Sequence, residues 1–292
     1  MNLDPHTLVV GATISAFLMA IVLIYLAHSF PPGIRGLREW GMGLVLIFFA
    51  ALFGSLRGMV PDFVSIVLGN LAVVAGLALI YIGLLRFNDR GLPMRWLAAV
   101  ILLNLLAVAY FTHVEFSFRI RVTIVTATTA LLFGLSLVTI LQGRPGHSLR
   151  FSDAFTAFFF LAETLLSLAR SVQAFWFEPA QSSFLSTSWT QQIFLAGYFL
   201  GVLLMAVGLI LLAHDRLKEE LQYLAAHDTL TGAFARRAFI DLAEREQARG
   251  QRSGRPVALL MLDLDHFKVI NDNHGHQVGD QVLRRFAEIA QS

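Results

Sequence analysis

Residues 256–280 read PVALLMLDLDHFKVINDNHGHQVGD, and this stretch decides how the C-terminal part of the chain folds and functions. Its first seven residues are an apolar run opened by proline, which predicts a short buried strand. Asp263 follows that strand, where a carboxylate can hold Mg²⁺ beside phosphates. Lys268 offers phosphate a point charge, and Gly275 and Gly279 let backbone approach a ligand closely. The pattern therefore indicates a nucleotide site.

A second motif precedes this stretch. Residues 227–239 read HDTLTGAFARRAF, and we call them the leading motif and residues 263–280 the acidic motif. Together they resemble the first half of a GGDEF domain, the catalytic domain of diguanylate cyclases. Ala233 and Ala235 depart from the family pattern D-x-L-T-G-L-x-N-R-R-x-F. The resemblance covers about residues 226–292 and implies a palm-like α/β domain that condenses two GTP into cyclic di-GMP and releases pyrophosphate.

The resemblance also assigns roles within the acidic motif. Asp263 would be the catalytic metal ligand for Mg²⁺ or Mn²⁺, with the carbonyl of Leu264 beside it. Four side chains would bind GTP: Lys268 at the phosphates, Asn271 and Asp280 at the guanine edge, and His276 elsewhere on the substrate. The chemistry suits guanine, because Asn both donates and accepts while Asp accepts from N–H groups. An isolated Asp at position 263 would instead indicate a strand-end cap or a surface acid.

The Gly-Gly-Asp-Glu-Phe hairpin that names the family lies further downstream in its members and does not occur in this sequence. After Asp280 the spacing predicts an amphipathic helix over residues 281–290, and the sequence stops at Ser292. A half domain lacks partner strands for its sheet. We therefore expect the chain as given to be truncated and inactive, as a fragment of a longer protein or as a natural truncation.

The remainder has the composition of a membrane protein. Of 292 residues, 56% are hydrophobic and 14% are charged, and the mean hydropathy is +0.66. Seven apolar runs are expected to cross the bilayer as helices: residues 8–30, 40–59, 63–85, 96–111, 120–141, 151–177 and 193–213. Run 96–111 is short and needs its flanks to complete the span. Core helices of a soluble protein fit poorly, because many runs are apolar on all sides.

The predicted fold is thus a mostly α membrane protein with seven transmembrane helices, followed by a helical linker and an incomplete α/β palm-like GGDEF domain. Its expected divisions are residues 1–214 for the transmembrane sensor, 215–226 for the linker and 227–292 for the partial GGDEF domain. Within the last, residues 233–249 have the pattern of an amphipathic helix and residues 250–254 that of a loop.

Basic residues near the span ends indicate the orientation. They gather in the loops after the first, third and fifth spans and after the last span, with Arg57, Arg119 and Arg121 as exceptions on the opposite side. This balance predicts a multi-pass protein of the bacterial inner (cytoplasmic) membrane, with the N-terminus outside and the C-terminal domain in the cytoplasm, where GTP is. The pI near 9.2 fits loops that face anionic lipid of the bilayer and gives no argument for nucleic acid. The absence of cysteine excludes disulfides and zinc–thiolate sites.

The linker carries Leu217, Leu221 and Leu224 at helical spacing. Two such stripes can pair as a short parallel coiled coil, which is stable only if the membrane part also dimerises. A homodimer is expected because GGDEF enzymes act as dimers in which each domain presents one GTP. Such a linker would transmit a shift in the membrane to the two facing half-sites. The alternative is a solvated stalk that only tethers the domain.

Several polar residues within or beside the spans suggest a second site. The candidates for a membrane ligand pocket are Arg57, Glu163, Arg170, Gln173, Arg119 and Arg121. Charged groups in spans usually face protein or water, and arginine pairs well with carboxylate or phosphate. These residues would form either a pocket for an unknown small anionic or zwitterionic ligand, or mutual ion pairs that lock the bundle.

The function predicted from the sequence is a membrane-bound diguanylate cyclase that a transmembrane sensor controls. An alternative is a non-catalytic membrane receptor whose degenerate GGDEF module senses GTP or binds a partner. A transporter-like bundle with a regulatory tail is a third possibility.

Overall fold

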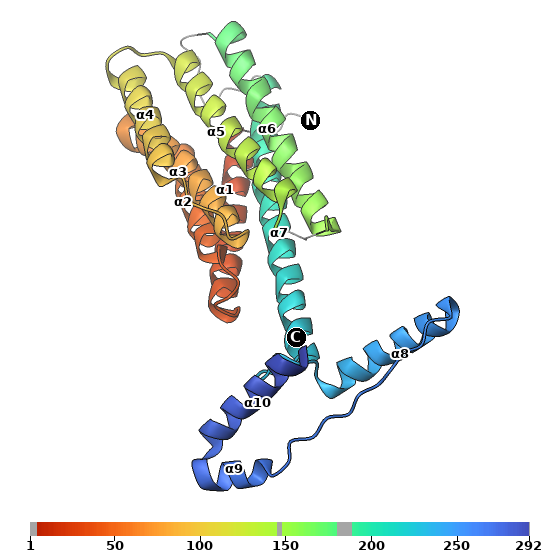
Figure 1. Ribbon diagram of the computed structural model, residues 1–292. Helices are drawn as coiled ribbons and strands as arrows, with labels where there is room; N and C mark the ends of the chain where they lie inside the picture. The colour runs from red at the N-terminus through yellow and green to blue at the C-terminus, as the bar shows by residue number, and fades with distance from the viewer. Residues whose placement is uncertain (1–4, 145–147, 180–188, 292) are drawn as a thin grey trace. The chain divides into compact units, whose positions relative to one another are not determined.

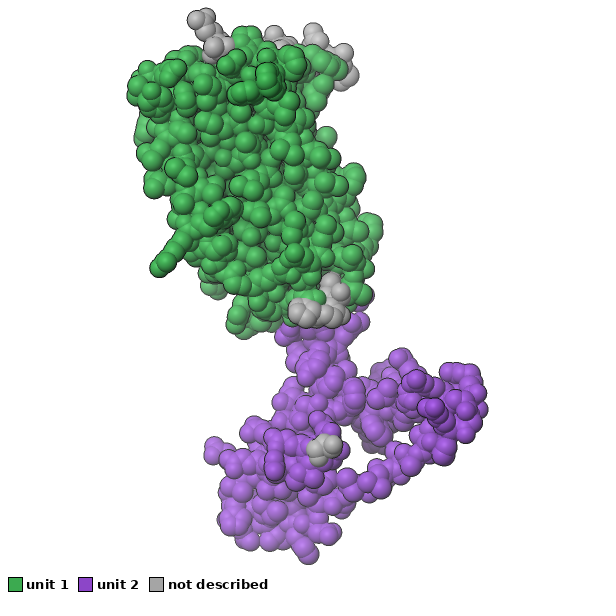
Figure 2. All heavy atoms as spheres, turned by 45° about the horizontal axis from the view of Figure 1, so that its top comes forward, with its two compact units in different colours: residues 1–216 green, residues 217–292 purple. Residues whose placement is uncertain are grey.

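The structure is a computed structural model that describes residues 5–144, 148–179 and 189–291. By its internal contacts the chain divides into two units, Met1–Arg216 and Leu217–Ser292, which Figure 2 colours separately. We call them the membrane unit and the C-terminal unit.

The membrane unit is built from long apolar helices that lie side by side (Figure 1). They are α1 (Pro5–Ser29), α2 (Leu37–Ser55), the π-helical turn η1 (Phe63–Leu68) with α3 (Gly69–Phe87), α4 (Met94–His113), α5 (Phe118–Gln142), α6 (Phe151–Phe177) and α7 (Trp189–Ala226). Within the described residues, seven helical segments are long and apolar enough to cross a membrane. The seven predicted spans are therefore confirmed as helices, and the architecture is compatible with a multi-pass membrane protein.

Small residues allow these helices to pack closely. A Cβ added to Gly43 of α2 would lie 2.7 Å from the carbonyl oxygen of Gly76 of α3, and the reverse substitution meets the same obstacle. Such contacts suit a bundle whose lipid-facing side chains gain little by association, so that close backbone packing contributes instead. The fully buried ring of Trp40 fills the space beside Gly83 further along the same pair of helices.

Two helices differ in detail from the sequence expectation. The third span begins with the π-helical turn η1, which continues directly into α3. The seventh continues without a break through the predicted linker, so that α7 has 38 residues. A single helix therefore runs from the last span to the leading motif.

The C-terminal unit contains α8 (Arg236–Ser253), α9 (Phe267–His274) and α10 (His276–Gln291), together with the last turns of α7. Of its described residues only Gly250, Gly279 and Ala287 are buried. Its helices therefore expose most of their apolar side chains, because few other elements cover them.

The strand predicted at residues 256–262 is absent from the described structure. Residues 255–264 have no regular structure, and apolar side chains along them are exposed, with Met261 at 92%. A strand requires a neighbour to satisfy its backbone groups, and no described segment pairs with this one. The palm-like α/β sheet expected from the resemblance is accordingly not formed in this structure.

Helix boundaries in this unit also differ from those expected. α8 starts at Arg236 rather than at residue 233 and continues through Ser253 to Gly254, whose φ of +68° ends it. The start is delayed because residues 233–235 belong to a closed turn. The acidic motif, expected as one polar turn, instead holds α9, which Gly275 separates from α10 with a φ of +81°.

Candidate functional site

The leading motif forms a closed loop between α7 and α8. The carboxylate of Asp228 accepts hydrogen bonds from the backbone N–H of Thr231 at 2.9 Å and from its hydroxyl at 2.8 Å. The backbone N–H of Asp228 donates to the carbonyl of Ala233 at 2.7 Å, and Gly232 takes the left-handed conformation that the turn needs. Asp228 thus organises the turn through both its side chain and its backbone.

These hydrogen bonds change the pKa of the Asp228 side chain. The hydroxyl and backbone N–H of Thr231, with a smaller contribution from the backbone of Leu230, hold its pKa below the ordinary value of 3.8. These donors favour the charged carboxylate. Sequence reasoning used this motif only to recognise the family and missed the structural role of Asp228. An Asx-turn pattern, Asp followed by Thr and Gly, was the signal for it.

Aromatic rings fix the same loop to the end of α7. The ring of His227 stacks on Tyr223 at 4.2 Å between centroids and contacts Phe234 at 4.8 Å. The backbone N–H of Ala235 donates to the carbonyl of Ala226 at 2.8 Å. The loop is therefore a folded junction and not an open tether.

The predicted metal ligands lie in the irregular segment before α9. The side chain of Asp263 is exposed, and Leu264 is half-buried. The carbonyl of Leu264 accepts a long hydrogen bond of 3.4 Å from the N–H of Phe267, which leaves it able to bind a cation. No cluster of three or more acidic or histidine side chains that could hold a metal occurs among the residues described.

The predicted substrate residues lie on a helix pair. Lys268 and Asn271 belong to α9, and His276 and Asp280 belong to α10. α9 and α10 pack together, and their close contact lies at Gly279, where an added Cβ would overlap Oδ1 of Asn271.

This contact brings Asn271 beside the residue that precedes Asp280. Both side chains assigned to the guanine edge are half-buried at the contact, whereas Lys268 and His276 are exposed. The structure therefore places Asn271 against Gly279, the residue before Asp280, and leaves Lys268, His276 and Asp263 exposed to solvent.

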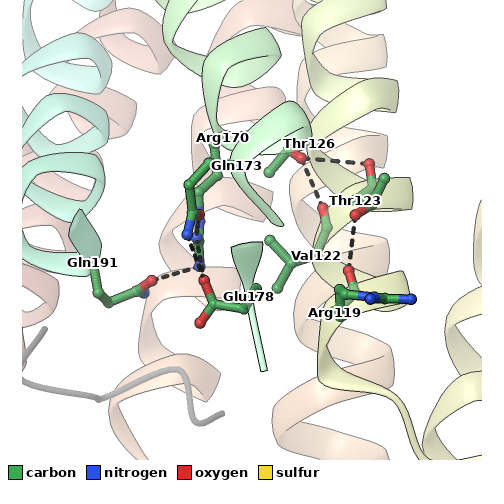
Figure 3. Close-up of polar contacts among 8 residues, drawn as sticks. All are labelled: Arg119, Val122, Thr123, Thr126, Arg170, Gln173, Glu178 and Gln191. Atoms are coloured by element: carbon green, nitrogen blue, oxygen red, sulfur yellow. Dashed lines mark hydrogen bonds and ion pairs between the residues drawn. The ribbon is translucent and has the colours of Figure 1, made fainter. Parts of the chain in front are cut away.

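The membrane unit contains a different polar site, which joins α6 to α7 (Figure 3). The guanidinium of Arg170 forms an ion pair of 2.8 Å with Glu178, donates to Oε1 of Gln191 at 2.8 Å and also bonds to Gln173. Gln173 in turn donates to Glu178 at 3.0 Å. Arg170 is only 3% exposed, and its plane lies over the ring of Phe194 at 5.2 Å.

The predicted pocket residues are divided by the structure. Four of the six line one cavity inside the bundle: Arg57, Arg121, Glu163 and Arg170. Gln173 belongs to the Arg170 network but does not line that cavity. Arg119 is exposed, and its guanidinium lies 6.0 Å from the ring of Phe175. Because two residues span about 200° of an α-helix, Arg119 faces away from the side that Arg121 presents.

Other cavity residues were not predicted. Gln191, Tyr198 and Asn70 also line it. Gln191 lies in an amide pair at the start of an otherwise apolar helix, and this was the available signal. Tyr198 and Asn70 gave none, because single polar residues are common in such helices.

Comparison with known proteins bears on the C-terminal unit. Residues 225–292 match the family described as "Diguanylate cyclase, GGDEF domain". Diguanylate cyclase VdcA of Vibrio cholerae is 45% identical over 81 residues, which cover 27% of this chain and 23% of that protein. Diguanylate cyclase DgcM of Escherichia coli K12 is 37% identical over 89 residues, or 29% of this chain and 22% of that protein.

An uncharacterized protein of Mycobacterium tuberculosis H37Rv is 50% identical over 68 residues, which are 23% of this chain and 11% of that protein. The chain thus spans less than a quarter of each of these three relatives. No solved structure matches it. The match and the two motifs together show that the segment of residues 225–292 belongs to the GGDEF family.

Proposed function

We propose that the complete protein is a membrane-bound diguanylate cyclase whose membrane unit controls its activity. One observation carries this proposal. Both GGDEF motifs follow, in order, a helix that begins as the last apolar span and continues unbroken to Ala226. We place the protein in the bacterial inner membrane, with the C-terminal unit in the cytoplasm.

The acidic motif would bind GTP in two parts. Asn271 and Asp280, which lie at the contact of α9 and α10, present an amide and a carboxylate to the hydrogen-bonding edge of guanine. The exposed ammonium of Lys268, three residues before Asn271 on the same helix, would contact the phosphates. His276 begins α10 and would help to hold the substrate.

Mg²⁺ or Mn²⁺ fits the oxygen donors of this motif. The carboxylate of Asp263 and the carbonyl of Leu264 are hard ligands of the kind that such ions share with substrate phosphates. When bound, the ion would polarise a phosphoryl oxygen and neutralise developing charge.

In the proposed reaction the 3′-hydroxyl of one GTP attacks the α-phosphorus of a second GTP. A new phosphodiester bond forms, the bond to the β-phosphate breaks, and pyrophosphate leaves with its electrons. The same step in the opposite direction closes the ring of cyclic di-GMP. Each GTP requires a separate C-terminal unit, so two copies of the protein must face one another.

The stripe on α7 supports this dimer. Leu221 and Leu224 are 55% and 49% exposed, although leucine favours burial. Pairing with the same helix of a second copy would cover them as a short coiled coil. A shift of α7 in the membrane would then reach the leading motif through a continuous helix.

Product formation by the complete protein tests the proposal. Wild type should convert GTP to cyclic di-GMP in the presence of Mg²⁺, and Asp263→Ala should lower the rate by about 1,000-fold, since a metal contributes several kcal/mol to such transition states. Asp241→Ala, which removes an exposed carboxylate from α8, is the matched control and should retain full rate. Equal product from wild type and Asp263→Ala would refute the role of Asp263, and no product from wild type would favour a non-catalytic receptor.

A further inference from the structure

The cavity inside the membrane unit has a volume of about 260 Å³. Side chains from every helix of the unit except α4 line it, within the part of the chain that the structure describes. Its charged members Arg57, Arg121 and Arg170 lie where α2 ends, α5 starts and α6 approaches its end. In antiparallel neighbours these positions belong to one end of the bundle.

Arg121 is the most informative of these residues. It is 4% exposed, and the only hydrogen bond from its side chain to a described residue runs to the hydroxyl of Thr112 at 3.1 Å. The guanidinium also lies 4.8 Å from the ring of Phe116, and it forms no ion pair with any residue that the structure describes. A guanidinium has five N–H donors, so most of its hydrogen-bonding capacity faces the cavity unused.

Arg57 lines the cavity beside Arg121. Burial, and next the positive charge of Arg121, lower the pKa of Arg57 to about 10, while Asp62 acts in the opposite direction. Asp62 is exposed and does not line the cavity. Asp62 acts on Arg121 as well. A further anion beside Arg121 would reduce the repulsion between the two like charges.

Arg170 and Glu163 do not serve as partners of Arg121. Arg170 is already bound by three side chains and forms a wall of the cavity. Glu163 also lines it, but seven residues before Arg170, about 10 Å along α6. Its carboxyl group packs against Gly201 of α7 and bonds to no side chain among those described. The lining therefore holds three arginines and one glutamate.

Away from the arginines the wall is mostly apolar, with Glu163 and Asn70 among its polar members. Leu77, Phe133 and Met205 line this part, from α3, α5 and α7. A ligand that fills the space therefore needs an anionic group at one end and an apolar body at the other. The volume lies just below the range of roughly 300–1,000 Å³ typical of ligand pockets, which excludes a two-chain lipid or a nucleotide.

We propose that this cavity binds a small monocarboxylate with an apolar body, a short-chain alkyl or aryl carboxylate, whose carboxylate pairs with Arg121. Arginine matches a carboxylate through two parallel N–H···O bonds. α7 contributes Phe194, Tyr198 and Met205 to the wall, so an occupant touches the helix that leads to the GGDEF segment. Binding itself does not depend on the proposed cyclase activity.

Calorimetric titration of the purified complete protein in nanodiscs of zwitterionic lipid tests the proposal. The probes are benzoate and hexanoate, each paired with its neutral amide, and empty nanodiscs correct for partition into lipid. Wild type should bind both carboxylates and neither amide. Arg121→Gln should weaken binding at least about tenfold, because a hydrogen bond to a charged group contributes about 1.5–3 kcal/mol. The affinity of Arg121→Lys for the carboxylates should lie between those of wild type and Arg121→Gln.

Arg119→Gln is the matched control, since it removes the same charge two residues away from an exposed position. It should bind as wild type does. Ala51→Phe fills the cavity from α2 without altering an arginine and should abolish binding even if Arg121→Gln fails to fold. Equal affinity for the amides, unchanged binding in Ala51→Phe, or no binding of either carboxylate to wild type would overturn the proposal.

Discussion

The two units of this protein differ in whether their key charged residues are buried and paired or exposed to solvent. In the membrane unit Arg170 is 3% exposed and is surrounded by three protein partners. In the C-terminal unit Asp263, the acid with the most important assigned role, is exposed in an irregular segment. A charge inside an apolar bundle must be paired with protein groups or with a ligand. A charge in water is solvated and needs no partner before its substrate binds. Structure is therefore more informative about the first unit, and sequence motifs about the second.

The largest expected effect breaks the polar network of the membrane unit. Arg170→Gln removes the buried ion pair to Glu178 and should lower the free energy of unfolding by about 3–5 kcal/mol. Thermal unfolding in detergent measures this loss. Arg119→Gln, on the exposed side of α5, should change it by less than about 0.5 kcal/mol. Similar losses in both variants would contradict the view that burial makes Arg170 structural.

The next effect belongs to the C-terminal unit and concerns ligand binding. Asp280→Asn keeps the shape of the side chain but removes the charged acceptor for guanine N–H groups. The affinity of the complete protein for GTP should fall by about 10- to 100-fold, as for loss of a charge-assisted hydrogen bond, with unfolding unaffected.

Asp272→Asn is the matched change for Asp280→Asn, at an exposed carboxylate of α9. Titration with GTP should give wild-type affinity for this control. An equal loss in both variants would mean that general charge, and not the position of Asp280, matters for the nucleotide.

The smallest effect concerns the leading motif. The pKa of Asp228 lies below 3.8 because Thr231 donates to its carboxylate. The stabilisation that the charged Asp228 carboxylate gives to the folded state is therefore present above the ordinary pKa. It is lost as pH falls through the lowered pKa. Thr231→Val should move the Asp228 pKa toward 3.8, as followed by carbon-13 NMR of labelled aspartate. Thr229→Val, which removes a neighbouring hydroxyl that makes no bond to Asp228, should leave the titration unchanged.

How far the sequence predicted the structure depends on whether each feature is local. Apolar length is a local property, so all seven spanning helices were found, and residues 96–111 extended at both ends as expected to give Met94–His113. A strand depends on distant partners, and the apolar run at residues 256–262 remained irregular because nothing described pairs with it. The short helix α9 was missed because its polar sequence, which ends at Gly275, resembles a turn.

The candidate sites also depend on contacts between residues that are distant in the sequence. The motifs singled out Asn271 and Asp280, but the contact of Asn271 with Gly279, the residue before Asp280, is a tertiary contact that no spacing rule reveals. For the membrane pocket, composition proposed six residues, and helix geometry decided that Arg121 faces the cavity and Arg119 does not. Gln191 lies 21 residues from Arg170 along the chain and could not be paired with it from sequence alone.

Nucleotide binding tests the central claim most directly. Calorimetric titration of the purified complete protein with a non-hydrolysable GTP analogue should show binding when Mg²⁺ is present. Chelation of the metal, or Asp263→Ala, should remove most of that binding, because this carboxylate would hold the cation that stabilises the phosphates. If the analogue does not bind with Mg²⁺, or binds equally well to Asp263→Ala without it, the acidic motif is not a metal-dependent guanine nucleotide site.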